Sequence, residues 1–232
     1  MLPARLSYFL NLHGPAILID TACSSSLVAI HLACKSIQSG ECEMALASGI
    51  NLFTFPVSNT IVNAIGIVAS DGKARTFDDS CDGVGQGEGA GAVLLKPLKQ
   101  ALKDNDHIYA VIKSSASNQD GKSIGITAPS AAAQEKVLVD VWKKAEIDPE
   151  TIGYIEAHGT ATKLGDPTEI SGINRAFKNF TTKKGFCGVG SIKSNIGHTI
   201  GAAGVASVIK VALALENKEL PPVSYTHLRA HE

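Results

Sequence analysis

Short apolar segments alternate along the chain with longer segments whose apolar residues recur at helical spacing. Strands are predicted at 16–19, 44–47, 92–95, 109–112, 153–156 and 186–192. Helices are predicted at 27–37, at 131–145, from Asp166 onward and from Thr199 onward. The segment 58–68 fits either a helix or a loop. This alternation of short buried strands with helices predicts an α/β fold.

The order strand, polar turn, helix occurs twice. It is found around Cys23 and again at 186–199, where the polar turn 193–198 precedes a helix rich in small residues. Two similar units indicate an internal duplication of the α/β layers. No segment has the composition of a flexible linker, so the chain fits one domain or a large part of a two-lobed one.

Composition and charge exclude several classes of protein. Hydrophobic residues make up 44% and charged residues 19% of the chain, and its 22 glycines follow no period, which excludes disordered, collagen-like and coiled-coil proteins. A formal charge of -1 gives no electrostatic reason to expect nucleic acid or a membrane as partner. Five cysteines without a CxxC pair suggest neither disulfides nor a zinc site, and a cytoplasmic protein is expected.

Two segments were compared with targeting and membrane patterns. Residues 1–12 lack the basic start and unbroken apolar region of a signal peptide. The most apolar segment, 200–215, is shorter than a membrane span and carries Lys210 in its middle. A buried helix is therefore predicted there.

Three residues at the ends of predicted strands could carry chemistry. Cys23 stands between a strand and a helix, where unpaired N–H groups and the helix dipole favour a thiolate, a good nucleophile for acyl transfer. Taken alone, a cysteine is more often a small buried residue, and the strand–turn–helix context brings the two interpretations close to even. His158 and His198 lie in polar, glycine-flanked turns, and either could be an ordinary core or surface histidine. Together the three point to an active site at one edge of an α/β fold.

The segments that contain these residues resemble the three active-site motifs of β-ketoacyl synthase domains of modular type I polyketide synthases. They read DTACSSSL at 20–27, EAHGT at 156–160 and KSNIGHT at 193–199, in the family's order. Shorter segments between them agree as well, among them GEGAG at 87–91 and GDP at 165–167. The resemblance covers nearly everything from Arg5 to Pro222.

The resemblance implies a thiolase-like fold of duplicated α/β layers and a decarboxylative Claisen condensation. Cys23 would accept the growing acyl chain, while His158 and His198 would promote loss of CO2 from a malonyl unit and stabilise the enolate. The substrates would be presented on the phosphopantetheine of an acyl carrier protein, with no cofactor or metal bound by this domain. Neighbouring synthase domains and a homodimer are the other expected partners.

The motifs also imply supporting residues, each with a purely structural alternative. Lys193 and Glu169 are similar to a lysine and an acidic residue of the family, and a buried Lys–Glu pair that fixes the histidine loops is slightly favoured over direct proton transfer. Asn195 is expected to shape its loop. Thr160 and Thr162 are expected to bind the pantetheine arm, although a threonine at a strand end often only satisfies backbone groups.

Three other patterns are set aside. The glycine-rich stretch 83–91 is followed by a strand and not by a helix, which argues against nucleotide binding. Gly121-Lys122-Ser123 lacks the earlier glycine of a phosphate-binding loop, and Ala116 stands there. His227 and His231 have the spacing of a metal pair without a third ligand.

The sequence departs from the family pattern at several points. Ala161 replaces a usual glycine, and Gln86 stands where many relatives carry arginine. The chain begins just before the cysteine strand and ends early, so we expect a ketosynthase domain at 1–222 that is truncated at both ends, with an unrelated tail at 223–232. We expect this isolated chain to fold poorly or to be inactive.

Several functions remain open at this stage. Besides a condensing enzyme, the chain fits a ketosynthase-like domain that only transfers or docks acyl carriers, or a β-ketoacyl synthase of the fatty-acid type. A degradative thiolase or a chalcone-type synthase would pair its cysteine with different partners in different motifs. No segment resembles the flanking signatures of a cysteine protease.

Overall fold

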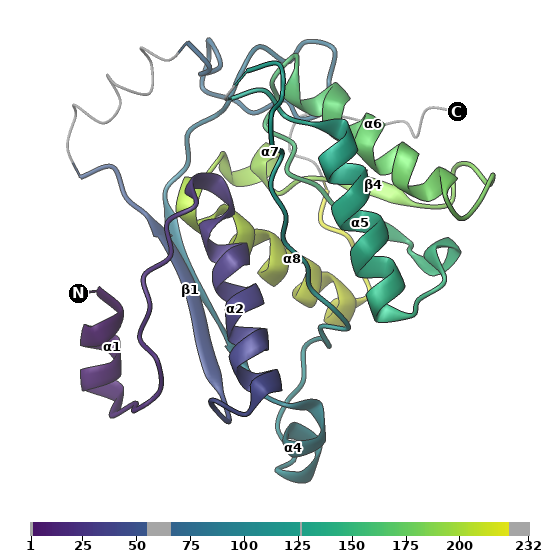
Figure 1. Ribbon diagram of the computed structural model, residues 1–232. Coiled ribbons are helices and arrows are strands. Elements are labelled where there is room, and N and C mark those ends of the chain that lie inside the picture. Colours follow the sequence, from purple (N-terminus) through teal and green to yellow (C-terminus); the bar gives the residue numbers. More distant parts are fainter. Residues whose placement is uncertain (1, 55–65, 126, 223–232) are drawn as a thin grey trace.

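The computed structural model describes residues 2–54, 66–125 and 127–222 (Figure 1). The α-helices in this part of the chain are α1 (Leu2–Leu10), α2 (Ser25–Ser39), α4 (Leu98–Lys103), α5 (Ala131–Ala145), α6 (Gly165–Lys178), α7 (Lys193–Ile196) and α8 (Ala203–Asn217). The 3-10 helices are η1 (Ala22–Ser24), η2 (Pro149–Thr151) and η3 (Ile200–Ala202). The strands are β1 (Ala45–Asn51), β2 (Gly89–Leu95), β3 (Tyr154–Glu156) and β4 (Gly188–Gly190).

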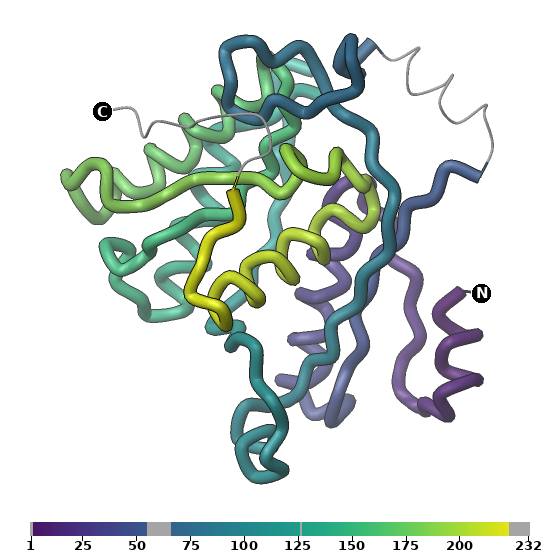
Figure 2. Tube along the Cα trace, turned by 180° about the vertical axis from the view of Figure 1, so that it is seen from behind, coloured from purple at the N-terminus to yellow at the C-terminus, as the bar shows by residue number. Residues whose placement is uncertain are grey.

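The strands form two small sheets that helices cover. Strands β1 and β2 pair antiparallel over their full length, from Ala45 opposite Leu95 to Asn51 opposite Gly89. Strands β3 and β4 pair parallel. Helices α2 and α8 lie side by side against the first sheet, as the view from behind in Figure 2 also shows. Helices α5 and α6 pack on each other beside the second sheet.

Two apolar centres hold these layers together. Ile30 of α2, Ala47 of β1 and Val205 of α8 form the buried centre of the first layer, together with Ala202. In the second, the Trp142 ring of α5 stands 4.7 Å from the Phe177 ring of α6, measured between ring centroids. Small residues at the first centre let the two helices approach the sheet closely, which suits the many alanines and glycines of the sequence.

Several predicted elements are confirmed by the structure. Helix α2 ends at Gly40, which has a left-handed φ of 77°, and α5 begins after Ser130, whose hydroxyl accepts the Ala133 N–H at 3.2 Å. The strands expected at 44–47, 92–95 and 153–156 are present, and the strand expected at 186–192 is shorter, at Gly188–Gly190. Of the segment 58–68, residues 58–65 lie outside the described part of the chain.

Two predicted strands are absent. The segments 16–19 and 109–112 have no strand assignment, and their apolar side chains are exposed, with 60% of Ile17 and 55% of Tyr109 accessible. The reason is that no described strand pairs with either segment, so neither forms a ladder of backbone hydrogen bonds. Helices α1, α4 and α7 were not predicted, because helices of 9, 6 and 4 residues leave little periodicity to detect.

The apolar helix at 200–217 is long and apolar enough, by length and composition, to cross a membrane. The apolar segment read from the sequence ended at 215, two residues earlier. Its contacts nevertheless are those of a core helix, because it packs against α2, β1 and β2. Lys210 in its middle pairs with Glu156, at 2.6 Å between Nζ and Oε2.

Candidate active site

A tight turn presents Cys23 at the start of α2. Ala22 has a positive φ of 53°, and Asp20 accepts the Ala22 N–H through its carboxylate at 3.1 Å. Ser25 donates its hydroxyl to the Ala22 carbonyl at 2.7 Å and accepts the Thr21 N–H at 2.9 Å. These local bonds hold a strained residue directly before the nucleophile candidate, at the position that the sequence predicted.

A carboxylate from α6 holds the loop that carries His158. Both oxygens of Glu169 accept backbone N–H groups, from His158 at 2.6 Å and from Gly159 at 2.8 Å. On the other side, Thr76 donates its hydroxyl to the Gly159 carbonyl at 3.0 Å, and Ser191 donates to the His158 carbonyl at 3.2 Å. The loop is thus fixed from three separate segments of the chain.

The glycine-rich stretch holds the loop of His198. The His198 N–H donates to the Gly85 carbonyl at 2.7 Å, and the Gly87 N–H donates to the His198 carbonyl at 3.2 Å. A Cβ on Gly87 would lie only 2.4 Å from the Ile196 carbonyl oxygen, so no larger residue fits there. This backbone contact explains glycines that the sequence analysis had left without a role.

The three predicted residues meet. The Cys23 Sγ and the ring nitrogens of His158 and His198 lie within 4.8 Å of one another. The two imidazole rings stand at 88° with centroids 5.4 Å apart. One small thioester can therefore reach all three side chains at once.

The hydrogen bonds of His198 define where its proton lies. Its Nδ1 accepts the Ile200 N–H at 3.1 Å, which places the ring proton on Nε2. That Nε2 is buried and has no hydrogen-bond partner within the described residues. A buried donor without a partner is costly, so this N–H is available to a group that enters the site.

Both imidazoles are neutral near pH 7. Burial and the nearby Lys193 lower the pKa of His198 to about 4. Burial, Lys193 and His198 lower the pKa of His158 to about 3, although the His158 residue keeps solvent-exposed surface. Neutral rings can donate a hydrogen bond to a developing oxyanion and can accept a proton from a thiol.

The expectation that the helix start favours a Cys23 thiolate is corrected by the structure. Burial raises the pKa of the Cys23 thiol, and the charge of Lys193 and a hydrogen bond from the cysteine's own backbone offset this only in part. The resting group is therefore the thiol. Its proton has to be removed as the sulfur attacks.

Lys193 and Glu169 do not form the direct pair that was expected. No salt bridge joins them within the described residues, and Glu169 instead binds the backbone of the His158 loop. Lys193 is only 2% exposed, and burial lowers its pKa while Glu169 and Glu156 raise it. The lysine supplies positive charge near the cysteine, and the glutamate shapes a loop.

The remaining predicted residues make local contacts. Asn195 donates to the Pro222 carbonyl at 3.0 Å, in keeping with its expected loop-shaping role. The Thr160 and Thr162 hydroxyls lie 3.0 Å apart, and Thr162 accepts the Gly165 N–H at 3.1 Å. Ala161 between them is fully buried with a left-handed φ of 61°, the conformation that favours glycine.

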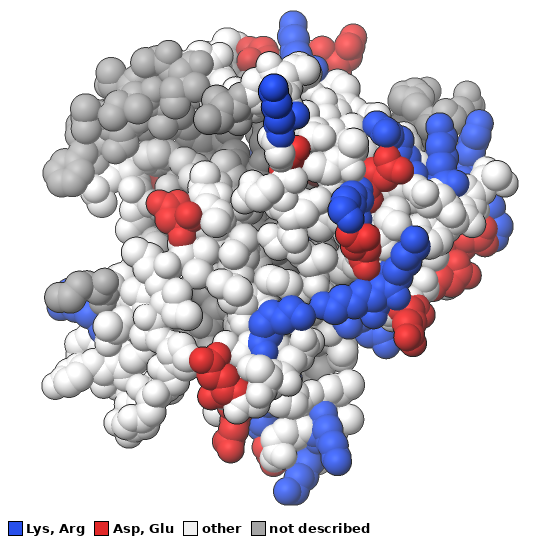
Figure 3. Space-filling model, viewed as in Figure 1, with Lys and Arg blue, Asp and Glu red and all other residues white. Residues whose placement is uncertain are grey.

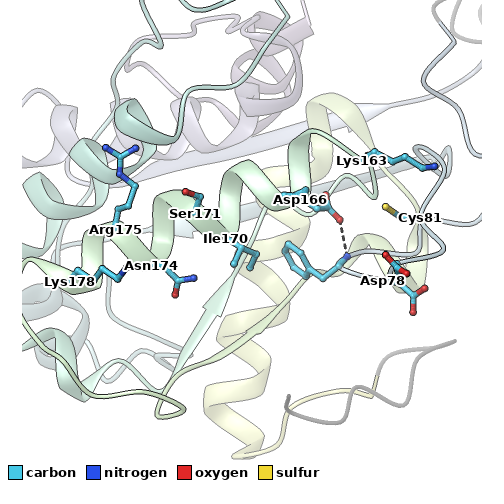
Figure 4. A pocket seen from close by; sticks show the side chains of 12 residues that line it. Asp78, Cys81, Lys163, Asp166, Ile170, Ser171, Asn174, Arg175 and Lys178 are labelled. Atoms are coloured by element: carbon cyan, nitrogen blue, oxygen red, sulfur yellow. Dashed lines mark hydrogen bonds between the residues drawn. The ribbon is translucent and has the colours of Figure 1, made fainter. Parts of the chain in front are cut away.

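A cavity along α6 lies away from these three residues. It has a volume of about 910 Å³ and follows one side of α6, as Figure 4 shows. Asp166 at its edge accepts the Phe77 N–H at 2.8 Å and the Ala161 N–H at 3.0 Å. Because Asp166 lines the cavity and also binds the loop, the cavity borders the outer side of the His158 loop. Cys23, His158 and His198 do not line it.

The same three side chains are also a ligand set for a soft metal ion, since thiolate and imidazole are the ligands that Zn²⁺ prefers. The buried ammonium group of Lys193 works against this, because like charges repel strongly at low dielectric. The chemistry that the set supports without a metal is acyl transfer.

Comparison with known proteins gives two adjoining family matches. The model of the beta-ketoacyl synthase N-terminal domain matches residues 1–101. The model of the beta-ketoacyl synthase C-terminal domain matches residues 109–227, which takes in part of the tail at 223–232. Cys23 lies in the first match, and both histidines lie in the second.

Similar proteins and structures agree with these matches. The chain is 52% identical over 218 residues to the polyketide synthase PksM of Bacillus subtilis, covering 94% of this chain and 5% of that protein. It is 46% identical to the highly reducing polyketide synthase alnA of Emericella nidulans, covering 97% of this chain and 9% of that protein.

Among solved structures, the ketosynthase from module 6 of the Bacillus subtilis bacillaene synthase matches with a TM-score of 0.93 and 50% identity, over 97% of this chain and 41% of that one. The oxazolomycin ketosynthase domain of Streptomyces albus matches with a TM-score of 0.95 and 41% identity, over 97% and 40%. The fold is therefore that of the thiolase-like ketosynthases. With its two family matches, the chain belongs to the β-ketoacyl synthase family.

Proposed function

We propose that the domain carrying this sequence catalyses decarboxylative Claisen condensation of acyl and malonyl thioesters in polyketide biosynthesis. The observation that supports this best is the meeting of one thiol and two neutral imidazoles within 4.8 Å of one another. Acyl transfer needs a nucleophile, a proton acceptor and oxyanion donors, and these three side chains supply all of them.

The first step is acyl transfer to Cys23. The sulfur attacks the carbonyl carbon of an acyl thioester, the imidazole of His158 takes the thiol proton, and that proton passes to the departing thiolate. One thioester bond forms and one breaks, so no external reactant is consumed. The charge of Lys193 favours the developing thiolate, whose formation burial otherwise opposes.

The second step makes the carbon–carbon bond. A malonyl thioester loses its carboxylate as CO2, and the electron pair left behind forms an enolate. His198 would donate its Nε2–H to that oxygen, and His158, whose ring centroid lies 5.4 Å from that of His198, would be the second donor. The enolate carbon then attacks the acyl group on Cys23, and the cysteine sulfur leaves and is reprotonated.

The substrates and partners follow from the same proposal. The acyl groups would arrive on the phosphopantetheine of an acyl carrier protein, and the domain would lie beside other synthase domains in a cytoplasmic homodimer. The names of the relatives, all polyketide synthases, favour this over fatty-acid synthesis. A domain that only transfers or docks acyl carriers is the alternative, and the presence of both histidines disfavours it.

Intact-mass measurement of acyl loading tests the proposal, with the complete ketosynthase domain that carries this sequence. Cys23→Ala is expected to abolish loading from an acyl carrier thioester, while Cys42→Ala, a half-buried cysteine outside the site, leaves it unchanged. His158→Ala and His198→Ala are each expected to slow malonyl decarboxylation about a hundredfold or more and to leave some loading. Normal loading of Cys23→Ala would refute the assignment.

A further inference from the structure

A buried ionic network lies behind the catalytic loops and has no part in the chemistry above. Lys210 of α8 donates to Glu156 of β3 at 2.6 Å and to the Tyr154 hydroxyl at 2.9 Å. Tyr154 donates to the same Glu156 oxygen at 2.7 Å. The side chains of Lys210 and Glu156 are only 9% and 5% exposed. We call these three residues the Glu156 network.

The second oxygen of Glu156 reaches the other catalytic loop. It accepts the Ile192 N–H at 2.6 Å, directly before Lys193 and the start of α7. Glu156 itself lies two residues before His158, on the strand that leads into the histidine loop. One carboxylate therefore joins the segment that carries His158, the segment that carries His198 and the core helix α8.

Packing alone does not fix this junction. A small cavity of about 190 Å³ borders Tyr154 and Lys210 on one side and Ser194 and Asn195 of α7 on the other. The Ile192 N–H that donates to Glu156 belongs to the residue directly before α7, so this bond helps to hold the start of the helix beside that space. The Lys193 N–H donates to the Ser191 hydroxyl at 3.4 Å. Glu156 also raises the pKa of Lys193 through its charge, which helps to keep that lysine protonated.

We propose that the Glu156 network is a positioning device that sets the separation of the His158 and His198 rings for decarboxylation. The proposal rests on the function proposed above. Loss of Lys210 leaves the Glu156 charge buried without its partner, which pulls the carboxylate toward solvent and releases the Ile192 N–H. The turn that presents Cys23 is held by Asp20 and Ser25, outside the network. Acyl loading is therefore expected to be far less sensitive to loss of the network than decarboxylation, which needs both rings in place.

The test compares two rates in the complete domain: loading of Cys23 by an acyl thioester, and release of CO2 from malonyl carrier. Lys210→Met is expected to slow CO2 release tenfold or more, the range typical of residues that orient a site, while loading stays within twofold of wild type. Lys210→Arg, which keeps the charge, is expected to recover most of the lost rate. Lys96→Met removes an ion pair far from the site and is expected to change neither rate.

Two further variants keep the test decisive. In Glu156→Gln with Lys210→Met, the amide can still accept from Ile192 and no charge is left unpaired, so CO2 release is expected to exceed that of Lys210→Met alone. If Lys210→Met fails to fold, Tyr154→Phe decides, with an expected two- to fivefold loss confined to CO2 release. The inference is overturned if the folded variants release CO2 at the wild-type rate. It is also overturned if they lose as much of the loading rate as of the rate of CO2 release. A wild-type domain that neither loads nor decarboxylates refutes the proposed function instead.

Discussion

A strained backbone residue, Ala22, directly precedes the candidate nucleophile Cys23. A left-handed φ of 53° at an alanine is unfavourable, and the side chains of Asp20 and Ser25 offset it through bonds to the Ala22 backbone. The result is a thiol held at a helix start but buried enough that it rests protonated. Its reactivity therefore depends on pH more steeply than that of a preformed thiolate.

The rate at which iodoacetamide alkylates Cys23 is expected to rise about tenfold per pH unit from pH 6 to pH 9, without a plateau. Only the thiolate reacts, and burial raises the pKa of this thiol. Mass spectrometry of the Cys23 peptide measures the rate. Lys193→Met is expected to slow it further at pH 8, because the lysine's charge favours the thiolate. A plateau below pH 8 would contradict the inferred thiol state.

The sequence was sufficient to select Cys23, His158 and His198, because each lies in a polar motif at the end of a predicted element. It was not sufficient to predict the protonation states and ion pairs of the site. The depressed pKa values of the histidines, the raised pKa of the thiol and the missing Lys193–Glu169 pair all depend on burial by distant segments. The Glu156 network was missed because a lysine in an apolar helix shows no partner in the sequence.

Helices α2 and α8 are joined directly at their N-terminal turns. Ser26, 1% exposed, accepts the Val205 N–H through its hydroxyl at 3.0 Å. Gly204 has no room for a side chain, since a Cβ there would lie 2.5 Å from Leu27 Cγ. This contact fixes the start of the cysteine helix against the helix that follows His198.

Ser26→Ala is expected to lower the free energy of unfolding by about 1–3 kcal/mol, because it leaves the buried Val205 N–H without an acceptor. Chemical denaturation followed by circular dichroism measures the change. Ser39→Ala, at the exposed end of the same helix, is expected to stay within about 0.5 kcal/mol of wild type. Equal effects of the two substitutions would show that the α2–α8 bond contributes nothing to stability.

Elements with their own stop and start signals were predicted well from the sequence. Gly40 and Ser130 mark helix ends through local backbone and side-chain bonds. The segments 16–19 and 109–112 have the composition of strands but lack described partners, and pairing is a property of two segments. Their apolar side chains are left exposed as a consequence.

At the scale of the whole molecule, one exposed apolar area lies around α1, besides other exposed apolar side chains such as Ile124 at 93% and Leu94 at 66%. Charged side chains gather over α5, α6 and α4 in Figure 3, while the area around α1 is largely uncharged. There Tyr8 is 83% exposed and Phe9 76%, and Leu18 in the nearby extended segment is 69% exposed. Exposed apolar surface of this extent is typical of an interaction site or of an aggregation-prone surface.

The 232-residue chain is therefore expected to self-associate and to enhance the fluorescence of 1-anilinonaphthalene-8-sulfonate several-fold over a fully folded control protein. Light scattering coupled to size-exclusion chromatography gives its mass in solution. Tyr8→Ser with Phe9→Ser is expected to reduce both effects. A strictly monomeric chain that leaves the dye unchanged would mean that this surface is covered in solution.

The bond from Ser26 to Val205 crosses between the two family segments, since one residue lies within 1–101 and the other within 109–227. A cut between 102 and 108 would leave the sulfur on one piece and both imidazoles on the other. Neither piece alone could join two carbons, and activity could return only if the pieces reassembled along the α2–α8 seam and along the contacts of the glycine-rich stretch with the His198 loop. Chimaeras that graft one half from another synthase must therefore preserve this seam as well as the motifs.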